Sequence, residues 1–175
     1  MQSLLKRIRE GQEGFSLLEM MLATVILLVG LVAVAQLVPA SILLNYRNRT
    51  DSTALVFAQR ELDQFLDQPL TSTSFSDVLG NSCSLGNPGS PNTVQGSPLQ
   101  SNQALIDFGQ PTVTNYSFLF SDSTDPTDTT YDVRWAVIIS GNGSTITSKR
   151  FILSVRQQGG NGYFLPVTLD TVVAR

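Results

Sequence analysis

The longest apolar stretch of the chain lies near its N-terminus. Between Met20 and Tyr46 no formally charged side chain occurs. The hydrocarbon core of a bilayer requires roughly 20 apolar residues in a helix, so this stretch is long enough for one membrane span. A single carboxylate, Glu19, stands at its start. Because a carboxylate in a membrane segment is costly and is retained for a partner or a function, Glu19 requires an explanation.

The helical pattern continues beyond the apolar stretch, but two residues weaken it. Pro39 removes one backbone hydrogen bond and predicts a kink or local melting at residues 36–39. Gly30, nine residues earlier, also lowers helix stability. We therefore expect one long helix over residues 15–68 with a weak point in its middle.

The second half of this helix is predicted to be amphipathic. Apolar residues recur at intervals of three and four, as expected for one face of a helix: Leu55, Ala58, Leu62 and Phe65. The charged residues fall off this stripe: Arg60, Glu61, Asp63 and Asp67. The helix should end before Pro69, which disfavours helical geometry at the preceding residue.

Residues 71–103 are rich in Ser, Thr, Asn, Gly and Pro and lack apolar periodicity. A segment of this length without secondary structure is usually functional or disordered. We predict an exposed loop.

Strand patterns begin after this segment. Two apolar and aromatic runs, 104–108 and 113–120, are separated by a turn signal at residues 109–111. In residues 131–137 apolar residues alternate with Asp132 and Arg134, which predicts a half-buried strand with these two side chains facing away from the core.

Two further strands are expected toward the C-terminus. The apolar residues of one alternate with polar ones, and it should pair with residues 131–137 as an antiparallel hairpin: Phe151, Leu153 and Val155. The last run, residues 163–173, contains Pro166, which cannot donate to a ladder and therefore indicates an edge strand.

Together these elements predict an α+β fold in which a long N-terminal transmembrane helix packs on a small antiparallel sheet. The apolar face of the sheet would cover the helix stripe: Val133, Trp135, Val137, Phe151, Leu153 and Val155. Five regions are expected: a leader at 1–14, a membrane half of the helix at 15–44, an amphipathic half at 45–69, the loop at 70–103 and the sheet at 104–175.

Composition narrows the possible functions. Charged residues make up 14% of the chain and the formal net charge is −3, so there is no basic footprint for nucleic acid. The chain contains no histidine and one cysteine, which excludes an imidazole-based triad and a zinc site built on His and Cys. We expect no enzymatic activity and no cofactor.

An acidic cluster is a weak candidate for a Ca²⁺ site. Its spacing does not match the D-x-D-x-D-G pattern, and aspartates of this kind commonly bond to the local backbone of a solvated turn, which is the interpretation we favour. The residues concerned are Asp122, Asp125, Asp128 and Asp132.

Charges flanking the apolar stretch predict its orientation. Three basic residues precede it, so the N-terminus should be cytoplasmic and the bulk of the chain outside: Lys6, Arg7 and Arg9. Cys83 would then lie in an oxidising compartment without an intrachain partner. It is either a lone thiol in a loop, which we favour, or a bridge to another subunit.

A new chain terminus would supply a cation for Glu19. If the chain were cut between Gly14 and Phe15, the α-amino group of Phe15 would lie within reach of Glu19 on its own or a neighbouring helix. Both groups are charged at neutral pH, and in an apolar setting each offsets the burial cost of the other.

The run GFSLLE at residues 14–19, behind basic residues and ahead of an uncharged apolar stretch, resembles the class III signal of type IV prepilins. The resemblance implies cleavage after Gly14 by a prepilin peptidase, N-methylation of Phe15 and assembly of the helices into a filament core, where Glu19 forms the assembly salt bridge. In this family a glycine and a proline bracket a helix segment that unwinds in filaments. Pro39 lies later than in many major pilins.

Two other interpretations of the N-terminus remain open. One is an ordinary secretory signal with an A-x-A site at residues 33–35, although the apolar run is longer than usual and contains Glu19. The other is an unprocessed single-pass anchor, which leaves Glu19 unexplained. The three alternatives predict different mature N-termini, namely Phe15, Gln36 and Met1.

Within the family, residues 58–63, which read AQRELD, and the block at 131–135 look like the PilV-type minor pilins, or pilus modification proteins. This similarity implies a minor pilin in the inner membrane that joins a filament and helps to initiate or modify its assembly, with a loop available for adhesion. Its partners would be other pilins, the prepilin peptidase/methyltransferase and the inner-membrane assembly platform. A minor pseudopilin of type II secretion and an anchored, exported binding domain that does not polymerise are the alternatives.

Overall fold

The computed structural model describes residues 14–101, 103–121, 129–142, 145–158 and 165–174. The chain divides into two compact units, Met1–Arg47 and Asn48–Arg175. The first contains the beginning of a long helix, and the second contains the end of that helix together with all the described strands. We describe each unit by itself.

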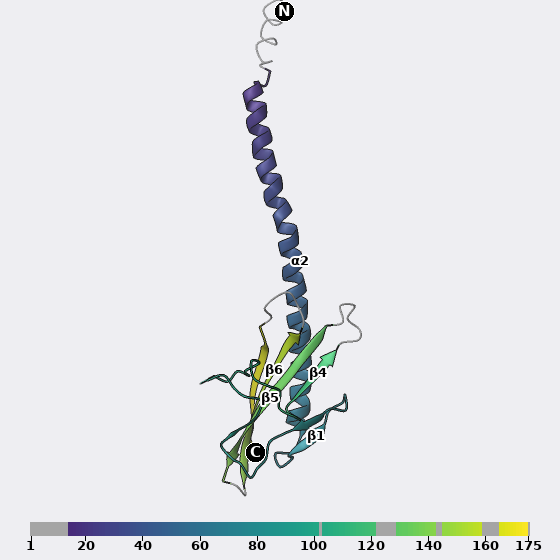
Figure 1. The fold of residues 1–175 in the computed structure, drawn as a ribbon, viewed down its shortest axis with the longest axis vertical. Helices are drawn as coiled ribbons and strands as arrows, with labels where there is room; N and C mark the ends of the chain where they lie inside the picture. The colour runs from purple at the N-terminus through teal and green to yellow at the C-terminus, as the bar shows by residue number, and fades with distance from the viewer. Residues whose placement is uncertain (1–13, 102, 122–128, 143–144, 159–164, 175) are drawn as a thin grey trace, which may run out of the picture. The chain divides into compact units, whose positions relative to one another are not determined.

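The predicted long helix is confirmed as α2, Leu17–Asp67, 51 residues in length (Figure 1). It is unbroken at Gly30 and at Pro39 in this single chain. The local melting expected at residues 36–39 does not occur in the single chain, and unwinding of this segment in an assembled filament stays a prediction. The helix ends before Pro69, as expected from the restriction that a proline places on the residue preceding it.

The second unit is built on an antiparallel sheet. Its strands follow the order β3-β5-β6-β7, and β4 pairs with β5 beside β3. The bounds are Val94–Gly96 for β3, Ser117–Ser121 for β4, Thr130–Gly141 for β5, Ile146–Gln158 for β6 and Val167–Ala174 for β7. Two further strands, β1 (Ser74–Ser76) and β2 (Ser82–Ser84), form a separate small hairpin.

The predicted C-terminal strands are confirmed. Strands β5 and β6 form the antiparallel hairpin, with Trp135 opposite Leu153. Strand β7 pairs with β6 and ends the strand order, which agrees with the edge position indicated by Pro166. The run at 113–120 becomes β4 in part, whereas the predicted strand at 104–108 is wrong, because only an isolated bridge from Ile106 to Leu99 forms there.

One face of the sheet packs on the second half of α2, as predicted. Ala58, Leu62 and Phe65 join a core with the inward residues of β5 and β6. Leu55, however, is exposed, so its assignment to the stripe was wrong. The buried face also includes Ala54, Phe57 and Glu61, each of which immediately precedes a predicted position. The prediction that Glu61 falls off the buried stripe was therefore wrong.

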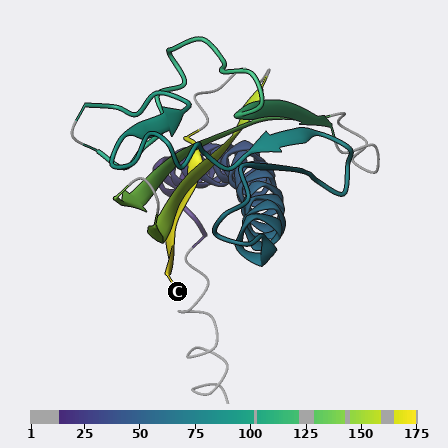
Figure 2. The same cartoon turned by 90° about the horizontal axis from the view of Figure 1, so that it is seen from below.

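The other face of the sheet is covered in part. Asp132 and Arg134 point away from the helix side, as the alternation predicted, but both are buried. The expectation of a half-buried strand was wrong because the chain between β3 and β4 covers this face, where Ile106 packs on Ala136 and Ile152. Figure 2 shows the sheet between the helix and part of this teal chain.

The prediction of an exposed loop at 70–103 was wrong in part, because the segment contains β1, β2 and β3. Cys83 and Leu85 are completely buried, and the Trp135 indole N–H donates to the Ser84 carbonyl oxygen at 2.9 Å. These three strands have three residues each, and Cys83 is the one buried residue among them. Such strands are too short to produce a periodic pattern, which explains why the sequence did not reveal them.

Candidate functional site

The first described residues form the start signal of helix α2. Gly14, Phe15 and Ser16 precede the helix. The Glu19 backbone N–H donates to the Ser16 hydroxyl at 3.2 Å, and the Met20 N–H donates to the Ser16 carbonyl at 3.1 Å. Ser16 is therefore the N-cap residue, and its spacing to Glu19 is that of a capping box.

Sequence reasoning missed this role of Ser16 and Glu19. The signal was present, because a serine followed three residues later by a glutamate ahead of an apolar run is a known helix-start pattern. An acidic side chain in the first turn also interacts favourably with the positive end of the helix dipole. Position 19 thus has a local structural reason to be acidic in addition to the predicted salt bridge.

The predicted salt bridge belongs to a processed chain. Here the Phe15 nitrogen is part of a peptide bond to Gly14, so the amine that would meet Glu19 does not exist in the intact chain. Phe15 is 77% exposed and Glu19 is also exposed. Both groups are accessible to an enzyme or a neighbouring subunit, and their pairing stays a prediction.

The described part of the first unit, residues 14–47, consists largely of exposed apolar side chains. From residue 14 to residue 49 every described side chain is exposed. Within the described part of the chain, one helix, α2, is long and apolar enough to cross a membrane. Exposed apolar surface of this extent requires lipid or other helices around it.

The hydroxyl groups in this apolar part are satisfied within the helix. Thr24 donates to the Met20 carbonyl at 2.6 Å, and Ser41 donates to the Val38 carbonyl at 3.0 Å. In hydrocarbon no water can satisfy polar groups, so hydrogen bonds within the segment are required. The arrangement suits a helix surrounded by lipid or by other apolar helices.

The other predicted site residues lie apart from this start signal. A Cβ added at Gly30 would meet nothing within 4 Å in the single chain. Asp132 is bound by Arg134, while the remaining members of the Ca²⁺ candidate lie outside the described residues: Asp122, Asp125 and Asp128. Among the residues that the structure describes, no group of three or more His, Cys, Asp or Glu side chains could hold a metal ion.

Cys83 differs from the predicted loop thiol. It lies in β2, it is completely buried, and its thiol is free. Burial, with the nearby Asp77 and Glu61 carboxyls, raises the pKa of the Cys83 thiol to about 12. The second alternative was a disulfide to another subunit. It would require the second compact unit, which we call the head, to open around β2.

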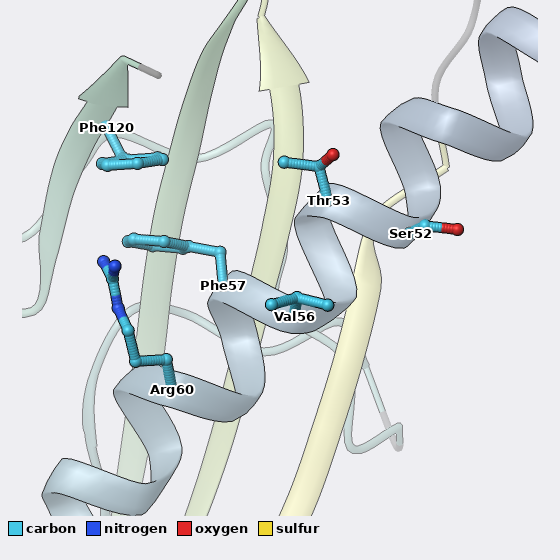
Figure 3. A pocket seen from close by; sticks show the side chains of 6 residues that line it. All are labelled: Ser52, Thr53, Val56, Phe57, Arg60 and Phe120. Atoms are coloured by element: carbon cyan, nitrogen blue, oxygen red, sulfur yellow. The ribbon is translucent and has the colours of Figure 1, made fainter. Parts of the chain in front are cut away.

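A groove on the head was also not predicted. It has a volume of about 320 Å³ and lies beside the exposed Val56 side chain. The Phe57 ring stacks on Phe120 at 4.1 Å between centroids, and the Arg60 guanidinium lies 4.7 Å from the Phe57 centroid. Figure 3 shows this stack along one side of the groove. Phe57 and Arg60 are three residues apart, which is the spacing that places two side chains together on a helix.

Comparison with known proteins agrees with the N-terminal geometry. A family model described as the prokaryotic N-terminal methylation motif matches residues 9–35. No curated protein and no solved structure matches the chain.

The matched residues include the run GFSLLE, the capped start of α2 and the first part of its apolar stretch. The head has no counterpart in these comparisons. At residues 9–35 the chain therefore carries the class III signal of type IV pilin-like proteins, followed by an α+β pilin-like arrangement of one long helix and an antiparallel sheet.

Proposed function

We propose that this chain is a minor pilin of a type IV pilus, similar to the PilV-type pilus modification proteins. In this proposal a prepilin peptidase cuts after Gly14 and the new N-terminus, Phe15, is methylated. The mature subunit is held in the inner membrane by residues 15–44 with its head outside. It then enters a filament with other pilins through the inner-membrane assembly platform and helps to initiate or modify the pilus.

One observation carries this proposal. The methylation motif is joined directly to a capped helix that has no charged side chain from Met20 to Tyr46 and whose side chains are exposed up to residue 49 in the single chain. In an isolated membrane anchor Glu19 would serve only the start of the helix, through its cap and dipole. A subunit whose helices stack has a further reason to keep it, because the amine at Phe15 of one chain and the carboxylate at Glu19 of another offset each other's burial.

The first test is the mass of the mature protein. We expect the N-terminal peptide of the membrane-extracted chain to begin at Phe15 and to carry one added methyl group. A chain that begins at Gln36 or at Met1 would contradict the proposal. The Gly14→Ala variant changes only the residue before the proposed cut, and it should reduce cleavage.

The second test concerns assembly. Glu19→Val should reduce recovery of the chain in sheared filaments by at least about tenfold, since the charge that neutralises the Phe15 amine is lost, while membrane insertion persists. The matched control is Glu10→Val, which removes an acid from the leader and should leave recovery unchanged. Unchanged assembly of Glu19→Val would remove the role assigned to Glu19.

A minor pseudopilin of type II secretion has the same signal and the same helix. The two machines are separated by the phenotype of a strain lacking the chain: a minor pilin affects pilus number or adhesion, and a pseudopilin affects export of secreted enzymes. A chain that is cut neither after Gly14 nor after Ala35, and that is recovered only in membranes, would favour an anchored binding domain that does not polymerise.

A further inference from the structure

A buried carboxyl group lies in the head, outside the membrane half of the helix. Glu61 on α2 is completely buried. Its Oε1 accepts a 3.3 Å hydrogen bond from the Arg60 guanidinium, which is itself 45% exposed. Among the described residues Oε2 has no hydrogen-bond partner. A buried carboxylate with one long ion pair and an unpartnered oxygen is costly in its charged form.

The groups facing Glu61 increase this cost. Asp77, on the turn between β1 and β2, is buried and adds a second negative charge. The Cys83 thiol of β2 also lies close enough to feel the Glu61 charge. On its own helix Glu61 meets Arg60 and Gln64. Burial and Asp77 outweigh these two partners, so the pKa of Glu61 is raised.

The small hairpin β1–β2 is the element that packs at this site. Its turn is tied to the helix by the Val78 N–H, which donates to the Gln64 side-chain oxygen at 2.9 Å. Phe75 packs edge-on against Phe65, with centroids 5.6 Å apart. Each strand has three residues, so the hairpin has a short ladder of its own and depends on its docking against α2 and the main sheet, and elements of this kind can open locally before the whole domain unfolds.

We propose that Glu61 is a proton-controlled latch: the uncharged carboxyl allows the β1–β2 hairpin to remain docked on α2, and ionisation beside Asp77 promotes release of the hairpin. The carboxylate formed on release is hydrated and separated from Asp77, which it could not be in the docked state. This inference does not depend on the proposed function, since it concerns the head alone.

The direction of the pH effect follows from linkage. A group whose pKa is raised in the docked state stabilises that state fully below its ordinary pKa, and the stabilisation is lost as pH rises through the raised value. The opening equilibrium constant should therefore rise by up to about tenfold per pH unit between the two pKa values and then level off. Alkaline conditions favour the open hairpin.

Amide hydrogen exchange of the full chain in detergent micelles tests the proposal. Protection factors, corrected for intrinsic exchange, are compared across pH for the Val78 and Leu85 amides of the hairpin region and for the Trp135 amide of β5. We expect the hairpin amides to be less protected than Trp135 throughout and to lose protection as pH rises. Hairpin amides that exchange only at the rate of Trp135, or whose protection does not change with pH, would overturn the latch.

Two variants assign the effect to Glu61. Glu61→Gln has nearly the same shape but cannot ionise, so its hairpin protection should be independent of pH. Asp63→Asn removes an exposed acid from the same helix and should keep the wild-type dependence. A pH dependence that persists in Glu61→Gln would overturn the assignment.

If Glu61→Gln does not fold, titration of the Glu61 side-chain carboxyl carbon by NMR in the unmodified chain replaces it. A midpoint above the ordinary range for glutamate supports the latch, and a midpoint within that range overturns it.

Discussion

Two aspartate–arginine pairs in the head show how differently the same pair of side chains can be placed. The Arg134 guanidinium holds Asp132 with a 3.0 Å bond from Nε to Oδ1 and a 2.8 Å bond from Nη2 to Oδ2, and both residues are buried. Arg134 Nη1 also donates to the Gln110 carbonyl at 2.7 Å, which fixes the covering chain on the sheet. Arg150 and Asp170 form a pair of similar geometry on the surface.

This contrast leads to a prediction at the scale of single residues. Asp132→Ala should lower the free energy of unfolding by about 3–5 kcal/mol, because it leaves a buried guanidinium without its carboxylate. Asp170→Ala, the matched control, should lower it by at most about 1 kcal/mol, since its pair is exposed to solvent. Urea unfolding in micelles, followed by the fluorescence of the single Trp135, measures both. Equal losses would contradict the role of burial.

Single residues also show what the sequence could predict at the site. Gly14, Phe15 and Glu19 could be predicted from the run GFSLLE, because that signal is local and its spacing is constrained by a single helix turn. The burial of Asp132, Arg134 and Glu61 could not be found in the same way. It depends on chain segments distant in sequence that cover them, and a polar residue gives no sign of being covered.

At the scale of elements, helix α2 was predictable because its apolar stretch is long and a proline ends it. The face of α2 that packs on the sheet was harder to predict. Leu55 and Val56 are apolar and neighbour the true stripe, so several rotations of the helix fit the pattern equally well. The structure selects the rotation in which Phe57 contacts the aromatic residues of β4.

The selected rotation is testable. Phe57 is 4% exposed and stacks on Phe120, whereas Leu55 is 38% exposed. Phe57→Ala should cost about 3–5 kcal/mol of unfolding free energy, the usual range for removing a buried aromatic ring. Leu55→Ala should change it by about 0.5 kcal/mol or less. Thermal or urea unfolding of both variants checks this, and a larger loss for Leu55→Ala would support the rotation first expected from the sequence.

Length also decided which strands could be predicted. Strands β5 and β6 were predicted because each exceeds ten residues and alternates clearly. Strands β1, β2 and β3 have three residues each and depend on tertiary contacts for their existence. Propensity and periodicity carry little information over so short a range.

At the scale of the whole molecule, the single cysteine reports whether the head is closed. Because Cys83 is completely buried and its pKa is raised to about 12, the native chain at pH 6, on the acidic side that favours the docked β1–β2 hairpin, should react with iodoacetamide at least about a hundredfold more slowly than the chain in urea at the same pH. Mass spectrometry of timed samples measures the rates.

The matched control moves the thiol by one position. A chain with Cys83→Ser and Ser82→Cys places it on the exposed neighbour in β2, and this thiol should react rapidly without urea. The same burial predicts that the native chain runs as a monomer on non-reducing gels. Rapid native labelling of Cys83, or a disulfide-linked dimer, would contradict the closed head.

The cap at Ser16 bears on how a leader could be removed. The bond between Gly14 and Phe15 lies outside helix α2, and the first backbone hydrogen bond of the helix is accepted by the Ser16 carbonyl. A peptidase that requires an extended substrate could therefore bind the backbone around this bond while α2 remains helical. The shortened chain would keep Ser16 as its N-cap, so helix α2 would not have to refold after removal of the leader.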